Sequence, residues 1–286
     1  MATLSIFANF FIDTDERFQR MRDSFFSFHQ AQVNKWVVNV RGRYSEEVLD
    51  FLRLHLCKNL VSYRLHSKEG WFFDTRKMLD VINSDYVLFW LEDHVNLGGV
   101  DLLMNIVSDM NKYELDYMLY SFWQRGRLRE RYTGVLLQSG SYLDYFEHNV
   151  TNNQIIQSNL GGYLISAASI CRLSLFRRLI LADDPVPKRW HIELPFDFEK
   201  APTDEHWLPL RVGILRQELF ASIDDDHGEE GSCLISRGLY PLREQRQSYA
   251  TGRRLGAKEQ TKAFAMKLYG FIIPDTLRAK AKRFFI

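Results

Sequence analysis

Short apolar runs alternate with helical hydrophobic repeats along the first hundred residues. Residues 3–11 form an apolar run of strand length, and the acidic stretch 13–16 that follows suits the start of a helix. Apolar side chains then recur at helical spacing, at Phe18, Met21, Phe25 and Phe28. The β-branched stretch 35–40 (KWVVNV) predicts a second strand.

The same alternation continues to residue 91. Ser45 can cap a helix whose buried face carries Val48, Leu49, Leu52 and Leu56. Residues 60–65 predict a third strand, 71–82 a further helix, and 85–91 (DYVLFWL) a fourth strand that is apolar enough to be buried on both faces.

Strands and helices that alternate in this way predict an α/β fold with a doubly wound, mostly parallel sheet flanked by helices. Such sheets bind ligands at the carboxyl ends of their strands. The residues to examine for function are therefore those that follow each strand: Asn9, 39–43, 66–68 and 92–94.

The second half of the chain is less regular. Residues 101–112 predict a helix, 117–123 a strand, and 162–165 a short strand running into a helix with Ile170, Leu173, Phe176 and Ile180 on its apolar face. Five prolines between 185 and 209 predict an irregular stretch. We expect one domain over 1–286, whose character changes at about residue 110 and again at about residue 236, where a basic C-terminal helical extension (237–286) begins.

Composition narrows the class of protein. The 286 residues are 46% hydrophobic, as expected of a globular chain, and the three widely spaced cysteines form no disulfide framework. The N-terminus lacks the features of a signal peptide, and no apolar run reaches the roughly 18–20 residues of a membrane helix. These features predict a cytoplasmic protein.

The net charge of +1 conceals an asymmetry. Residues 237–286 carry 12 Lys and Arg against three acidic residues, whereas residues 1–236 carry 25 basic and 33 acidic residues. Apolar and basic residues alternate in this tail, which is typical of an interfacial helix on an anionic membrane, at the inner face of the membrane. The alternative is a C-terminal helix packed on the acidic body. No nucleic-acid-binding motif accompanies the basic tail, so nucleic acid is not an expected partner.

The chemistry concentrates at Glu92-Asp93-His94, directly after the predicted fourth strand. Ionisable groups at the end of a buried strand are costly unless they reach a cleft, a metal or charged partners. Carboxylate and imidazole together suit a divalent cation such as Mn²⁺ or Mg²⁺, which would neutralise a diphosphate. The alternative is a helix-capping Asp followed by a surface His.

At this point the chain resembles the GT-A glycosyltransferases, whose nucleotide-binding half has a fourth strand ending in an acidic DxD or EDD motif. Residues 5–9 (SIFAN) resemble their first strand, 23–26 (DSFF) the following helix and 92–94 the acidic motif, so that the resemblance covers about residues 3–110. The chain departs from the pattern at His94, where the family usually has an acidic metal ligand. The resemblance implies that Asn9, Asn39 and Arg41 hold the nucleobase and ribose.

The resemblance also implies a nucleotide-sugar-binding half (about 1–110) and an acceptor-binding half (111–236), together with further residue roles. Arg76 could reach a phosphate, and Glu92 and Asp93 belong to the donor site; the alternative for Arg76 is a solvated arginine on a helix face. The cation would be held by Asp93, His94 and His227, a histidine that follows the acidic run 224–226. The alternative for that run is a solvated acidic loop. Asp204 and Glu205 are the favoured candidates for the general base on the acceptor.

These features predict a glycosyltransferase that moves a sugar from a nucleotide-sugar donor to a glycan or lipid-linked glycan acceptor, in cell-surface polysaccharide or lipopolysaccharide synthesis. The sequence lacks the phosphate-loop, dinucleotide-binding, zinc-protease and serine-hydrolase motifs, which weakens those alternatives. The alternative from another class is a non-catalytic glycan- or nucleotide-binding relative, which the histidine at the end of the motif favours.

Overall fold

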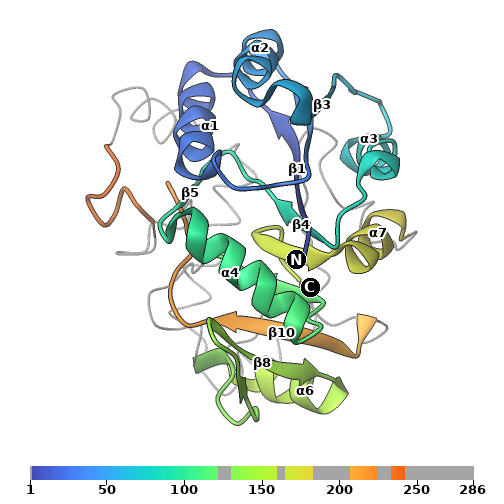
Figure 1. Ribbon diagram of the computed structural model, residues 1–286, viewed down its shortest axis with the longest axis vertical. Helices are drawn as coiled ribbons and strands as arrows, with labels where there is room; N and C mark the ends of the chain where they lie inside the picture. Colours follow the sequence, from blue (N-terminus) through green and yellow to red (C-terminus); the bar gives the residue numbers. More distant parts are fainter. Residues whose placement is uncertain (1, 122–129, 160–164, 183–206, 225–232, 242–286) are drawn as a thin grey trace, which may run out of the picture. The chain divides into compact units, whose positions relative to one another are not determined.

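A nine-stranded sheet in the order β3-β2-β1-β4-β9-β6-β10-β8-β7 runs through the computed structural model, which describes residues 2–121, 130–159, 165–182, 207–224 and 233–241 (Figure 1). Its strands are β1 (Leu4–Phe11), β2 (Lys35–Arg41), β3 (Leu60–Tyr63), β4 (Tyr86–Phe89), β6 (Tyr117–Leu119), β7 (Gln138–Ser139), β8 (Leu143–His148), β9 (Ser169–Arg172) and β10 (Leu210–Leu215). A separate antiparallel ribbon pairs β5 (His94–Asn96) with β11 (Phe220–Ser222).

Helices flank the sheet, at α1 (Asp15–Phe28), α2 (Ser45–Leu56), α3 (Trp71–Arg76), α4 (Gly99–Lys112), α6 (Val150–Asn159) and α7 (Leu173–Leu181). Strands β3, β2, β1 and β4 are mutually parallel, whereas β9 runs antiparallel between β4 and β6. The predicted α/β class, with a mostly parallel sheet between helices, is confirmed.

The two faces of β1 contact different helices. Leu4, Ile6 and Ala8 belong to the core cluster that includes the buried sides of α1, α2 and α4, whereas Phe7 packs with α3 and α7 on the other face. Side chains alternate across a strand, so a strand covered on both faces has apolar residues at both sets of positions. This burial explains why Leu4–Phe11 is apolar except at Ser5 and Asn9, which are themselves buried.

A side chain caps the first residues of α1 but not those of α2, where the sequence predicts Ser45 as the cap. Thr14 caps α1, and its hydroxyl accepts the backbone N–H of Arg17 at 3.2 Å. Ser45, predicted as the cap of the second helix, is instead the first residue of α2, and Tyr44 occupies the cap position without a side-chain hydrogen bond. The predicted buried face of α2 is confirmed.

Two predicted helices are longer than the helices in the structure. The helix predicted over 71–82 ends at Arg76, and a separate 3₁₀ turn, Leu79–Val81, follows it. Ile170, predicted on a helix, lies in β9, and α7 begins only at Leu173. Residues 162–164 of the predicted strand lie outside the described residues.

Residues 1–240 form one unit and residues 241–286 a second, of which only Pro241 is described. The division of the chain into donor, acceptor and C-terminal segments therefore stays a prediction. Among the described residues, no helix is long and apolar enough to cross a membrane.

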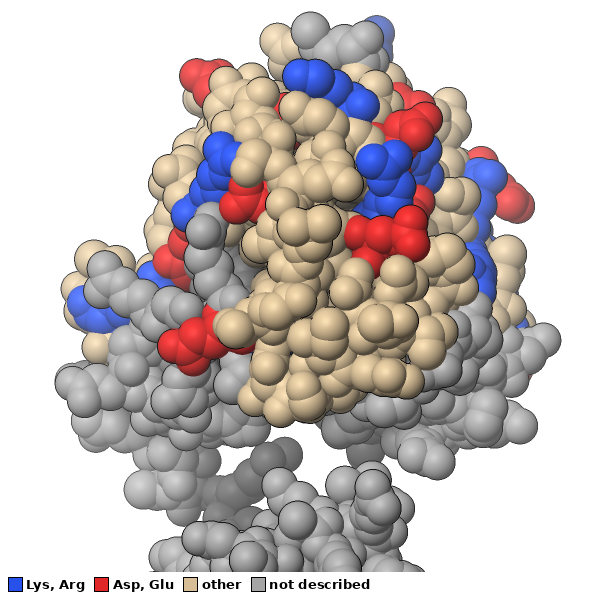
Figure 2. All heavy atoms as spheres, turned by 90° about the horizontal axis from the view of Figure 1, so that it is seen from below, with Lys and Arg blue, Asp and Glu red and all other residues tan. Residues whose placement is uncertain are grey.

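Figure 2 shows the face that lies at the lower end of Figure 1, where β8 and α6 are found. The described surface at its centre is largely uncharged, and Lys, Arg, Asp and Glu gather towards its edges. The sequence of α6, VTNNQIIQSN, contains no charged residue, in agreement with this view.

The difference between the two helix starts is testable with a pair of alanine variants. Thr14→Ala removes an N-cap hydrogen bond and should lower the free energy of unfolding by about 1 kcal/mol. Ser45→Ala removes a hydroxyl that caps nothing, and should change it by less than about 0.5 kcal/mol. Urea denaturation of both variants measures this difference, and equal losses would contradict the assignment of the caps.

Candidate functional site

Two buried asparagines connect the carboxyl ends of β1 and β2. Asn9 and Asn39 lie opposite each other in the parallel register, and the side-chain N–H of Asn39 donates to the Asn9 side-chain oxygen at 2.9 Å. Asn39 also exchanges hydrogen bonds with the backbone of Leu65, beyond β3. Asn9 donates to the Trp71 carbonyl and to the Thr75 hydroxyl of α3. The pair thus joins three strand ends to one helix.

The two predicted arginines lie in different surroundings. Arg41, at the end of β2, is 3% exposed, and its guanidinium carbon lies 5.9 Å from the ring centroid of Phe11.

Gly42 then turns the chain with a φ of 96°, and a Cβ there would meet the Ile12 carbonyl oxygen at 2.4 Å. Only glycine suits this turn.

Arg76 ends α3 and donates to the carbonyl oxygens of Ile180 and Ala182 at 3.0 and 2.9 Å. A cation is favourable at the C-terminus of a helix, where carbonyl groups lack helical partners. Arg76 therefore connects α3 to the end of α7. Its predicted contact with a phosphate stays a prediction.

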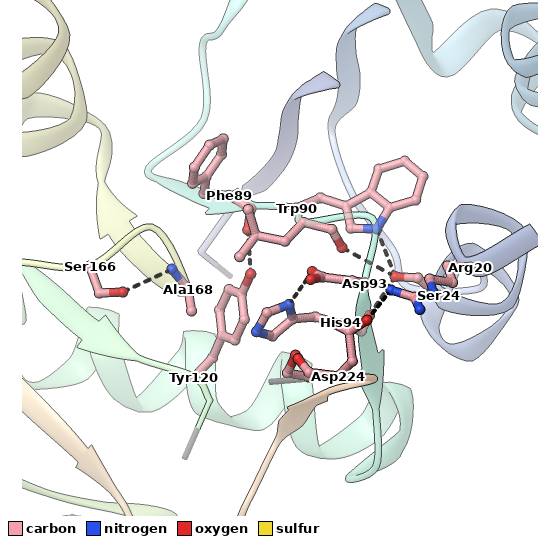
Figure 3. Close-up of polar contacts among 12 residues, drawn as sticks. Arg20, Ser24, Phe89, Trp90, Asp93, His94, Tyr120, Ser166, Ala168 and Asp224 are labelled. Atoms are coloured by element: carbon pink, nitrogen blue, oxygen red, sulfur yellow. Dashed lines mark hydrogen bonds and ion pairs between the residues drawn. The ribbon is translucent and has the colours of Figure 1, made fainter. Parts of the chain in front are cut away.

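The motif Glu92-Asp93-His94 follows β4, and its last residue, His94, begins β5. The Nδ1 atom of His94 lies 2.7 Å from Oδ1 of Asp93, and the imidazole is largely buried (Figure 3). Its Nε2 atom points away from Asp93, is buried, and has no hydrogen-bond partner among the described residues. When Nδ1 carries the proton that it donates to Asp93, a neutral ring presents the Nε2 lone pair to a ligand.

The neighbouring carboxylates have different protonation behaviour. Burial, together with the negative charge of Asp93, raises the pKa of Glu92 to about 7. Burial would also raise the pKa of Asp93, but the His94 imidazole outweighs it, so that this pKa is lowered. Because the pKa of Glu92 is raised and that of Asp93 is lowered, Asp93 is the carboxylate of the two that stays ionised.

Aromatic and polar groups enclose His94. The Tyr120 ring lies 5.9 Å from the imidazole, centroid to centroid, and the Tyr120 hydroxyl donates to the Phe89 carbonyl at 2.6 Å. The indole N–H of Trp90 donates to the Ser24 hydroxyl at 2.8 Å, and that hydroxyl donates to the His94 carbonyl (Figure 3). These contacts hold both the ring and the backbone of His94.

The fold resembles that of solved structures of S. aureus TarS. The crystal structure of TarS 1–349 is 15% identical, with a TM-score of 0.51, over 76% of this chain and 59% of that chain. The same fragment in complex with UDP-GlcNAc is 18% identical, with a TM-score of 0.52, over 80% and 60%. The longer TarS structure is 16% identical, with a TM-score of 0.51, over 76% and 36%.

The fold is GT-A-like. TarS is a GT-A-type glycosyltransferase, and at this level of identity the likeness shows the fold alone. This chain spans about 60% of the length of the TarS 1–349 structures that it matches. No protein-family model matches the chain, and no curated protein sequence matches it.

Some predicted residues cannot be placed in this GT-A-like fold. Asp204, Glu205 and His227 lie outside the described residues. Within the described part of the chain, no group of three or more His, Cys, Asp or Glu side chains could hold a metal ion. Of the predicted cation ligands, the structure brings together Asp93 and His94.

The sequence analysis missed Arg20, Ser24 and Tyr120, which contact the motif or its neighbours (Figure 3). It noted Asp224 only as part of an acidic run, and the structure shows that this carboxylate accepts from Arg20. No signal in the sequence marks Arg20, because it lies to the side of the helical repeat formed by Phe18, Met21, Phe25 and Phe28. Its burial, and with it the need for a charged partner, appears only in the structure.

The asparagine pair allows a stability test. Asn39→Ala leaves the buried N–H of Leu65 and the side-chain oxygen of Asn9 without their partner, and should cost about 2 kcal/mol of unfolding free energy. Asn34 supplies the control, because its side chain bonds that of Asn83 at an exposed position. Asn34→Ala should cost less than about 0.5 kcal/mol in the same denaturation experiment. Equal costs would show that the buried network does not stabilise the strand ends.

Proposed function

We propose that this chain is a glycosyltransferase that takes a sugar from a nucleotide-sugar donor and transfers it to a glycan or lipid-linked glycan acceptor. The observation that carries the proposal is the Asp93–His94 pair that follows β4, with a buried imidazole and a partly exposed carboxylate, in a fold shared with a glycosyltransferase whose structure contains UDP-GlcNAc. Uridine diphosphate sugars are therefore the first donors to test. Cell-surface polysaccharide or lipopolysaccharide synthesis is the process that would use such an acceptor.

The donor would bind along the carboxyl ends of β1, β2 and β4. Asn9, Asn39 and Arg41 lie at the ends of β1 and β2, where ligands bind to sheets of this kind. The asparagine amides already bond one another and the neighbouring backbone, so they would shape the nucleoside site largely through the loops that they hold. Arg76 and Glu92 complete the proposed donor-binding set.

His94 fits a divalent cation through Nε2. A histidine that binds a metal usually donates its other ring N–H to a carboxylate, which orients the ring. Asp93 accepts such a bond here, and the buried Nε2 atom lacks a partner among the described residues. Mn²⁺ or Mg²⁺ with few protein ligands keeps positions for donor phosphates, whose charge it would neutralise. His227 would be a further ligand, and Asp93 could add its other oxygen.

If the transfer inverts the configuration at the anomeric carbon of the sugar, a general base must accept the proton of the acceptor hydroxyl. Asp204 and Glu205 are proposed for this role on the strength of the family resemblance alone. The basic segment 237–286 would hold the enzyme at an anionic membrane surface, where a lipid-linked acceptor is found.

One observation favours a second function. The Asp93 oxygen that bonds His94 is already engaged, and the family's usual acidic ligand is replaced by an imidazole. A non-catalytic relative that binds a nucleotide or glycan would have this feature. Such a protein would bind a nucleotide without turning over any donor sugar.

Thermal unfolding with added nucleotides tests the donor site. We expect UDP with Mn²⁺ to raise the melting temperature of the wild-type protein, because a ligand that binds only the folded state stabilises it by mass action. His94→Gln should abolish the part of the shift that depends on Mn²⁺. His55→Gln, an exposed position on α2, should retain the full shift.

The outcomes of this experiment separate the claims. A shift with UDP that is the same in Mn²⁺ and in EDTA would contradict the role of His94 as a cation ligand. No shift with UDP, GDP, CMP, dTDP or their sugars would contradict the proposed donor site as a whole.

A further inference from the structure

One face of α1 carries three polar residues at helical spacing. Arg20, Ser24 and Ser27 stand at positions i, i+4 and i+7, which places them on one side of a helix. The Ser24 hydroxyl donates to the His94 carbonyl, and the Ser27 hydroxyl accepts the backbone N–H of Asn96 at 2.9 Å. Two members of this polar stripe therefore bond β5 directly.

The third member, Arg20, is a buried cation held by two carboxylates. It is 8% exposed, and its guanidinium donates to Glu16 and to Asp224, each at 2.5 Å. Burial alone would lower the pKa of Arg20, but the charges of Asp224 and Glu16 outweigh it and raise this pKa. Breaking such a buried pair is expensive because it leaves a charge without compensation.

Asp224 lies beside the motif. It follows β11, in which Ser222 is paired with His94, and the N–H of Ile223 donates to the Asp93 carbonyl at 2.6 Å. The Arg20 side chain thus joins α1 to the second residue after β11, the partner strand of β5 (Figure 3).

A further set of contacts closes the same region. The N–H groups of Leu234 and Ile235 donate to the carbonyls of Ser222 and Ile223 at 2.9 and 3.1 Å. The Tyr240 hydroxyl donates to Asp23, on α1, at 2.5 Å. The β5–β11 ribbon is therefore attached to α1 before and after residues 225–232.

We propose that Arg20 is a positioning residue for the donor site, which holds the β5–β11 ribbon through Asp224 and thereby fixes Asp93 and His94 beside the donor diphosphate. This role rests on the proposed function. No contact between Arg20 and the donor is required, since the guanidinium acts through Asp224 and the ribbon.

Amide hydrogen exchange tests the structural part without any ligand. In Arg20→Met the amide of Ile223 should exchange about tenfold faster or more, since coupling within a buried charge network is worth about that factor. The β2 amides, remote from this pair, should be unchanged. Arg20→Lys keeps the charge and should restore slower exchange in part.

Arg216→Met is the matched control. Arg216 donates to Asp144 at 2.8 Å, an arginine–aspartate pair on the β8–β10 side of the sheet, which β9 and β6 separate from β4. Its loss should leave the Ile223 amide within about twofold of wild type. Asp224→Asn is a second variant that removes the same ion pair, and it decides the question if Arg20→Met does not fold.

Titration calorimetry with UDP and Mn²⁺ then measures the effect on the donor site. Arg20→Met should weaken UDP binding about tenfold, Arg20→Lys less, and Arg216→Met by no more than about twofold. Unchanged exchange at Ile223, or unchanged UDP affinity despite faster exchange, would overturn the proposal. If the wild-type protein binds neither UDP nor GDP, CMP or dTDP, the proposed function is overturned instead, and the exchange data alone then decide whether Arg20 holds the ribbon.

Discussion

Buried polar groups at the ends of apolar strands must find partners, and this requirement determines the geometry of the candidate site. β1 and β4 are covered on both faces, so the chain leaves each strand from within the protein interior. Asn9 and Asn39 satisfy each other and the nearby backbone, whereas Asp93 satisfies one nitrogen of His94. The other imidazole nitrogen is buried and has no hydrogen-bond partner in the part of the chain that the structure describes, which makes it the most informative atom of the site.

Local patterns predicted the elements that surround the site because those elements are defined by short-range periodicity. The apolar run of β1, the helical repeat of α1 and the buried face of α2 are all confirmed. The cap of α2 was predicted wrongly, since Ser45 fits a cap in sequence whereas the tight turn at Gly42 starts the helix one residue earlier. The motif at residues 92–94 was found because ionisable groups rarely end a buried strand without a reason.

Pairings between distant parts of the chain could not be predicted in the same way. Ile170 fits a helical repeat in sequence, yet β9 lies between β4 and β6, where contacts across the sheet override local periodicity. Arg20 and Asp224 are 204 positions apart, and no spacing rule connects them. The acidic run beginning at Asp224 showed only that cations or solvent must balance it; the structure shows that Arg20 balances its first member.

The central claim is that the chain transfers a sugar from a nucleotide donor, and turnover tests it more directly than binding. The measurement is the release of UDP from a panel of UDP-sugars in the presence of Mn²⁺, for the wild-type protein and for Asp93→Asn. Where no glycan acceptor is added, water serves as the acceptor and the donor is hydrolysed. The account predicts that at least one donor is consumed by wild type and that Asp93→Asn, which loses the orienting carboxylate of His94, is slower by about tenfold or more. A protein that binds UDP tightly but consumes no nucleotide sugar, with or without a glycan acceptor, would contradict it.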